Sequence, residues 1–234
     1  MISTGLELTT FVTALNAEAT IDTTLLDVLV DNARAILEEE RPWMVLRKTD
    51  TSKTVTTGNT WQTAIDLSTI TDFSRFYGEY SIVLFDGDNR RHHFRQVPWD
   101  RRLEYKDDSN SFVYNHNSKT LYLNGTLPFS GTLYINYVAT STAVDLTSGS
   151  VVWTPFPSRF LPVLGYYAVG IYKGAVDYDS VNRKMLGVNF DTLKALKNAM
   201  EMWDNEAQLQ SLQLNDPTDP YGYQRLGTVN RYDS

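Results

Sequence analysis

The chain has 234 residues, of which 42% are hydrophobic and 12% aromatic, enough apolar material for one large domain or two small ones. It contains no cysteine, which excludes disulfides, cysteine-based zinc sites and thiol nucleophiles. The formal net charge of −7 argues against a protein that grips nucleic acid with its whole surface, because such binding needs clustered lysine and arginine.

The N-terminal residues lack the basic and apolar pattern of a secretory signal. No stretch approaches the roughly 20 apolar residues that a membrane-spanning helix needs. We therefore expect a soluble protein that stays where it is made and does not contact a membrane.

Apolar residues at steps of three and four predict two N-terminal helices. The first covers about residues 6–16. The second covers residues 22–41, with Asp22 as its N-cap and Pro42 as its stop. The apolar stripe of this second helix consists of Leu25, Leu26, Leu29, Val30, Ala33, Ile36 and Leu37.

From about residue 49 to residue 139 threonine, valine and aromatic residues dominate, and turn signals recur every eight to twelve residues. Two tight turns are expected at residues 86–89 and 115–118. This pattern predicts a small antiparallel sandwich or barrel of five or six short strands. The expected strands cover residues 80–85, 92–97, 111–114, 120–123 and 132–138.

Two further helices are expected after the strands. One covers residues 158–174, with Ser158 as its N-cap and Gly174 at its end. The other covers residues 179–209. Its apolar seam consists of Leu186, Phe190, Leu193, Leu196, Met200, Trp203 and Ala207, and Gly187 marks a possible kink.

Because each amphipathic helix must bury its stripe, the simplest arrangement packs the N- and C-terminal helices together. The predicted fold class is therefore α+β. A helical bundle (residues 1–48 and 151–210) carries an inserted β module (residues 49–150), and an extended arm follows (residues 211–234).

The C-terminal arm has two prolines, several turn formers and no helical or strand period. Disordered segments are usually poor in aromatic residues. The arm instead carries spaced apolar side chains, which favours docking on another surface over a frayed end. These side chains belong to Tyr221, Tyr223, Leu226, Val229 and Tyr232.

No pattern indicates a catalytic, cofactor or metal site. His92 and His93 are adjacent in an expected strand, so their side chains point to opposite faces. Residues 86–89 resemble the start of a calcium loop, but the later ligands are missing and a hairpin turn explains them. The basic cluster at residues 90–95 fits a solvated or interface-facing hairpin better than a phosphate site.

Six short segments, taken in order, carry a family resemblance. They are Arg-Pro-Trp at 41–43, Val-Pro-Trp-Asp-Arg-Arg at 97–102, Gly-Thr-Leu-Tyr at 131–134, Trp-Thr-Pro-Phe-Pro-Ser-Arg-Phe at 153–160, Gly-Ala-Val-Asp-Tyr-Asp at 174–179 and Ala-Met-Glu-Met-Trp-Asp at 199–204. The ordered set resembles the head-to-tail adaptor (connector) proteins of tailed bacteriophages, specifically those with a β module inserted in the helical domain. The resemblance covers roughly residues 6–210.

The resemblance implies a structural virion protein without catalytic residues or cofactors, made in the host cytoplasm and placed in the virion neck. Such adaptors form a ring of twelve subunits that extends the DNA channel below the portal, and DNA passes without specific binding. The implied partners are the portal protein, a tail, stopper or nozzle protein, and other copies of the chain.

The resemblance also gives the arm a target, because in this family the C-terminal arm docks on the portal. The expected anchors are Tyr221, Tyr223, Leu226 and Tyr232, with Arg225 and Arg231 as polar contacts. The main alternative is another tail or neck accessory protein whose β module binds a partner protein or a glycan. A glycan hydrolase is the third possibility.

Overall fold

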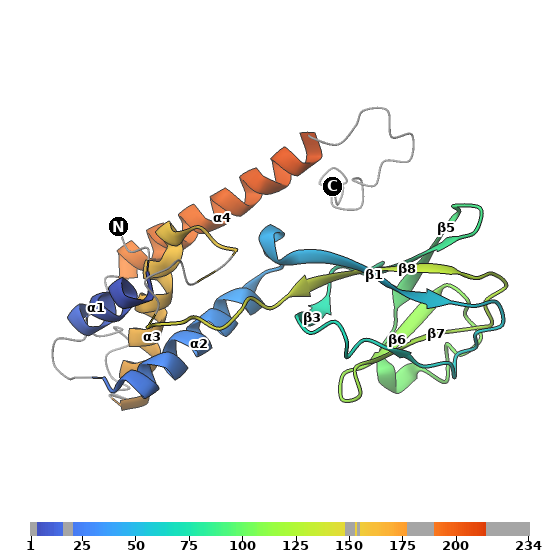
Figure 1. Ribbon diagram of the computed structural model, residues 1–234, viewed down its shortest axis with the longest axis horizontal. Helices are drawn as coiled ribbons and strands as arrows, with labels where there is room; N and C mark the ends of the chain where they lie inside the picture. Colours follow the sequence, from blue (N-terminus) through green and yellow to red (C-terminus); the bar gives the residue numbers. More distant parts are fainter. Residues whose placement is uncertain (1–3, 16–20, 148–152, 154, 177–189, 214–234) are drawn as a thin grey trace, which may run out of the picture. The chain divides into compact units, whose positions relative to one another are not determined.

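A computed structural model of the chain describes residues 4–15, 21–147, 153, 155–176 and 190–213 (Figure 1). The chain divides into two compact units. One unit, here called the helical unit, consists of residues 1–34 and 144–234. The other, here called the sheet unit, consists of residues 35–143.

The helical unit begins with helix α1 (Gly5–Leu15), close to the predicted position. A capping box fixes its start: Thr4 and Glu7 exchange hydrogen bonds between backbone amide and side-chain oxygen, both of 3.2 Å. A Cβ atom on Gly5 would lie 2.1 Å from the carbonyl oxygen of Asp145, so only glycine allows this close approach. Phe11 packs edge-on against Tyr166 of helix α3, with ring centroids 5.3 Å apart.

Helix α2 (Thr23–Glu40) confirms the predicted second helix. The Thr24 amide donates to the Asp22 carboxylate at 2.9 Å, so Asp22 is the N-cap. The helix ends two residues before Pro42, as the restriction that proline places on its neighbour requires.

The C-terminal helices differ from the prediction at their ends. Helix α3 (Leu161–Val176) follows a 3-10 turn, η3 (Ser158–Phe160), so Ser158 is not its N-cap. The helix also continues two residues past Gly174, since a single glycine costs a helix only about 1 kcal/mol relative to alanine. Helix α4 (Phe190–Gln213) contains the later part of the predicted seam, and the predicted start, Leu186 and Gly187 lie outside the described residues.

The sheet unit contains eight strands. They are β1 (Arg47–Val55), β2 (Ile65–Asp66), β3 (Phe73–Phe76), β4 (Ile82–Asp86), β5 (Arg91–Gln96), β6 (Ser111–Asn115), β7 (Thr120–Leu123) and β8 (Gly131–Ala139). Short 3-10 turns, η1 (Met44–Leu46) and η2 (Trp99–Arg101), precede β1 and follow β5.

The strands form one large, nearly closed sheet in the order β1-β8-β4-β5-β6-β7-β2, and β3 pairs with the end of β8. All pairs are antiparallel except β5 with β6, which run parallel. Figure 1 shows β1 and β8 side by side as two long strands. The inner face buries a continuous apolar core that includes Ile82, Leu84, Phe94, Phe112, Leu121, Leu133 and Ile135.

The predicted fold, a helical bundle with a small inserted β module, is therefore wrong. The described residues hold four α-helices beside a sheet of eight strands, and one strand pair is parallel. The five predicted strands are present as β4 to β8. The sequence did not predict β1, β2 and β3, because β1 is almost entirely polar, β2 has two residues and β3, Phe-Ser-Arg-Phe, does not alternate apolar with polar residues.

The last turns of α2 belong to the sheet unit and are tied into it by polar contacts. The fully buried Trp43 donates its indole N–H to the carbonyl oxygen of Leu37 at 2.7 Å. Arg75 of β3 donates to the carbonyl oxygen of Glu38 at 3.2 Å, satisfying an acceptor that the helix end leaves open. The buried carboxylate of Glu38 accepts from the hydroxyl and the amide of Ser141.

Among the described helices, none combines the length and the apolar character that crossing a bilayer demands.

Candidate ligand-binding pocket

The six residues expected to bind the portal all lie in the C-terminal arm. Tyr221, Tyr223, Arg225, Leu226, Arg231 and Tyr232 fall within residues 214–234, which are outside the described part of the chain. Their role stays a prediction.

The hairpin turn at residues 86–89 is confirmed, and Asp86 organises it. Its Oδ1 atom accepts from the backbone amides of Asp88 and Arg90, each at 2.9 Å, and its Oδ2 atom lies 3.0 Å from His92 Nε2. The hydrogen bond from His92, followed by those of the two amides, holds the pKa of Asp86 below its usual range. All of these contacts serve the turn, so it needs no ligand to explain it.

The two adjacent histidines have different surroundings. The His92 ring stacks on Phe129 at a centroid distance of 3.7 Å, whereas His93 meets the ring of Tyr80 edge-on. Burial lowers the pKa of His93, and the charges of Arg91 and His92 lower it further. Within the described ranges, no group of three or more histidine, aspartate or glutamate side chains is arranged to hold a metal ion.

A second polar cluster joins β1, the loop before β3 and β8. Lys48 Nζ lies 2.5 Å from Asp72 Oδ2, and the Tyr137 hydroxyl donates to Asp72 Oδ1 at 2.9 Å. Burial favours the neutral Asp72, but the hydrogen bonds from Lys48 and Tyr137 outweigh it and keep the pKa of the carboxyl below its usual value. Burial, and then the bond to Asp72, raises the pKa of Tyr137. These groups satisfy one another, which indicates a structural role.

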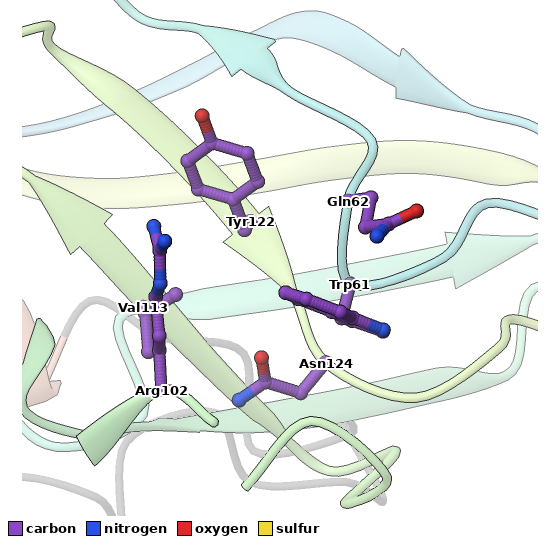
Figure 2. Close-up of a pocket in the computed structure, with 6 residues that line it drawn as sticks. All are labelled: Trp61, Gln62, Arg102, Val113, Tyr122 and Asn124. Carbon is purple, nitrogen blue, oxygen red and sulfur yellow. The ribbon is translucent and has the colours of Figure 1, made fainter.

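The sheet unit also contains a pocket of about 350 Å³ on the outer side of the β6–β7 hairpin (Figure 2). This volume is at the lower end of the range for small-molecule sites. Its lining combines aromatic, aliphatic and polar side chains and contains no carboxylate. The lining residues are Trp61, Gln62, Arg102, Val113, Tyr122 and Asn124.

A compact turn presents Trp61 and Gln62 between β1 and β2. The Thr63 amide donates to the Thr60 carbonyl oxygen at 2.8 Å, and the Thr60 amide donates to the Thr63 hydroxyl at 3.1 Å. Thr60 also forms an isolated bridge with Thr126, which anchors the turn to the segment that follows β7. The turn therefore holds the backbone of Trp61 in place, while the indole ring stays partly exposed.

Strand alternation places Tyr122 and Val113 on the outer face. Val113 and Tyr122 are paired across β6 and β7, while their neighbours, such as Leu121, point into the core. The turn η2 contacts β6, and its Trp99 ring lies 5.7 Å from the Tyr122 ring. Because η2 covers this part of β6, Val113 is only 2% exposed. The Tyr122 ring gives the pocket an aromatic wall.

Arg102 closes one side of the pocket. Its guanidinium lies over the Trp99 ring, 4.3 Å from the centroid, a cation–π contact that restrains a long side chain. No described carboxylate lies within ion-pair distance of Arg102. The preceding Arg101, in contrast, pairs with Glu104 at 2.7 Å.

Asn124 is the buried polar residue of the pocket, with 1% exposure. Its Nδ2 atom donates to the Ser111 hydroxyl oxygen at 2.8 Å, and that hydroxyl donates its own proton to the Asp108 carbonyl oxygen at 3.2 Å. The Asn124 amide orientation is therefore set, and its Oδ1 atom is left as an acceptor. Figure 2 shows this oxygen on the pocket side of the amide, between Arg102 and Trp61.

In comparisons with known proteins, no family model and no curated protein matches the chain. The sequence pattern placed Arg102 only within the 97–102 segment of the family resemblance and did not single out Trp61, Tyr122 or Asn124. These residues come from three separate segments that only the sheet brings together, so their spacing along the chain carried no signal.

Proposed function

We propose that the chain is a structural virion protein, a head-to-tail adaptor whose subunits form a ring under the portal of a tailed bacteriophage. The ring has twelve subunits, extends the DNA channel and links the portal to a tail, stopper or nozzle protein. DNA passes without specific binding. The proposal rests on the ordered resemblance of segments between residues 6 and 210 and on the surface of α2.

The observation that carries the proposal is a second apolar stripe on α2. The helix buries one stripe, which includes Leu26, Leu29, Val30, Ala33 and Leu37. Leu25, Val28 and Ile36 are 43%, 53% and 43% exposed, although they are large and apolar. They follow one another at steps that keep them on a single face, with Asn32 between them. Large apolar side chains gathered on one exposed helix face are typical of a protein–protein interface.

A closed ring needs two different surfaces on every subunit, because its contacts are heterologous. Helices α1 and α4 of the helical unit also expose large apolar side chains. Leu6 of α1 is 56% exposed and Met202 of α4 is 63% exposed. We assign the α2 stripe to one lateral contact, and the exposed faces of α1 and α4 that carry Leu6 and Met202 to the contact with the next subunit.

The distribution of charge fits a channel wall. The acidic excess of the chain lies almost entirely in the helical unit, whereas acidic and basic residues nearly balance in the sheet unit. Acidic walls repel phosphate and keep DNA from adhering. The proposal therefore places the helical unit, not the sheet unit, around the DNA.

The proposal assigns no catalysis to the chain. A glycan hydrolase would need two carboxylates facing each other across a cleft, and the six residues that line the pocket include none.

The test uses portal-bearing heads of the phage that encodes the chain. The full chain is expected to bind at the neck in twelve copies, counted by electron microscopy of the heads. A chain that lacks residues 216–234 is expected to fold normally but not to join the heads, because the arm that docks on the portal is gone. Normal joining by the truncated chain would refute the role of the arm, and a different copy number at the neck would refute the dodecamer.

A further inference from the structure

We propose that the pocket formed by Trp61, Gln62, Arg102, Val113, Tyr122 and Asn124 binds an acidic sugar, a hexuronate unit of a polysaccharide. This function goes beyond the adaptor role, which needs no small-molecule site. It would let each subunit hold a saccharide on its sheet unit.

The aromatic side chains suit one face of a sugar ring. A pyranose has an apolar face of C–H groups and a rim of hydroxyls. Trp61 and Tyr122 are both partly exposed and line the same small space, where their rings offer flat apolar area (Figure 2). Tyr122 is backed by Trp99, whose ring centroid lies 5.7 Å from that of Tyr122.

Asn124 supplies a fixed hydrogen-bond acceptor. Since the Ser111 hydroxyl donates to Asp108, it must accept from Asn124 Nδ2, and Asn124 Oδ1 faces the pocket as an acceptor alone. A sugar hydroxyl can donate to this oxygen. A bare anion such as a carboxylate has no proton to give it, so the pocket is not built for an anion only.

Arg102 supplies the complementary charge. Its guanidinium is held on the Trp99 ring and meets no carboxylate within ion-pair distance among the described residues. A planar guanidinium pairs best with a carboxylate through two parallel hydrogen bonds. A neutral sugar would leave this charge unpaired, whereas a hexuronate satisfies both Arg102 and Asn124. The amide of Gln62 offers a further donor and acceptor at the exposed edge.

The size of the pocket sets the length of ligand that it encloses. About 350 Å³ accommodates one or two sugar rings, and the rest of a polymer would extend into solvent. The expected affinity of such a small site is modest, with a dissociation constant on the order of a millimolar or somewhat below.

The experiment uses the full chain labelled with ¹⁵N-tryptophan and follows the indole N–H resonances by NMR. The probe is tetragalacturonic acid, and its fully methyl-esterified form is the matched neutral ligand. A tetraglutamate peptide tests whether an acidic peptide binds instead. The Trp61 resonance is assigned from the Trp61→Phe variant.

Tetragalacturonic acid is expected to shift the Trp61 resonance in a saturable way. Loss of a charge-assisted hydrogen bond should weaken binding at least about tenfold for the methyl ester and for Arg102→Gln. The matched variant Arg101→Gln should bind as the unchanged chain does, because Arg101 pairs with Glu104 outside the pocket.

Three results would overturn the proposal. The first is no Trp61 shift at about 10 mM tetragalacturonic acid, a concentration well above a millimolar dissociation constant. The second is equal binding of the acid and its methyl ester, or of the unchanged chain and Arg102→Gln. The third is tetraglutamate binding as tightly as the saccharide, which would make the pocket a peptide site.

Discussion

The exposed stripe of α2 gives the sharpest test of assembly. The perturbation is the triple variant Leu25→Gln, Val28→Gln and Ile36→Gln. Each original side chain keeps roughly half of its surface exposed, between 43% and 53%. Complete burial of such a side chain contributes about 1.5–3 kcal/mol, so covering the remaining half contributes about 1 kcal/mol per residue. The three together contribute about 3 kcal/mol per contact, which corresponds to a factor of about 150 in association.

The assay compares the variant and the unchanged chain in ring formation on portal complexes, followed by sedimentation velocity. The variant is expected to need about 150-fold more protein for the same occupancy if each subunit joins through one such contact. The melting temperature should hardly change, since the replaced side chains are exposed and glutamine is a good helix former. Leu103→Gln is the matched control, because Leu103 is 62% exposed and lies outside α2. If the triple variant assembles as readily as the control, the α2 stripe is not the lateral contact.

Two further predictions concern stability. Trp43→Phe removes the indole that donates to Leu37 and leaves a buried carbonyl and a gap, so the free energy of unfolding should fall by about 2–4 kcal/mol in urea titrations followed by far-UV circular dichroism. Trp99→Phe, at a partly buried ring, should cost less than about 1 kcal/mol, and equal losses would contradict the buried bond. Because the fold lowers the pKa of His93, the unfolded chain binds a proton more readily. The contribution of His93 to the free energy of unfolding is therefore fully present above about pH 6.5, and it decreases as the pH falls towards the lower pKa of the folded state. His93→Gln should flatten this slope between about pH 7 and pH 5, whereas His116→Gln, in the exposed β6–β7 turn, should not; an unchanged slope in His93→Gln would refute the assignment.

The parts of the fold that could be predicted are those whose cause is local. Asp22 caps α2 and Pro42 lies just past its end, and both effects act within a few residues. Asp86 likewise organises a turn whose partners lie within six positions along the chain. In each case the residue type and its immediate neighbours determine the backbone, so no knowledge of the rest of the molecule is needed.

The pocket depends instead on contacts between distant segments. Trp61 lies in the loop after β1, Arg102 follows η2, and Tyr122 lies in β7. Arg102 gains its role from the Trp99 ring, and Asn124 from a hydroxyl thirteen positions earlier in the chain. None of these residue types is unusual for a surface, so only the folded sheet makes them a candidate site.

The error in the predicted fold has a related cause at the edges of the sheet. Strand β1 lies at one end of the strand order and carries Lys48, Asp50 and Lys53, with a register shift between the last two. Strand β2 lies at the other end and has two residues. Charged side chains, irregular pairing and short length are the features by which edge strands avoid pairing with other molecules. The same features remove the apolar alternation by which strands are recognised, so the sheet is larger than its apolar pattern indicates.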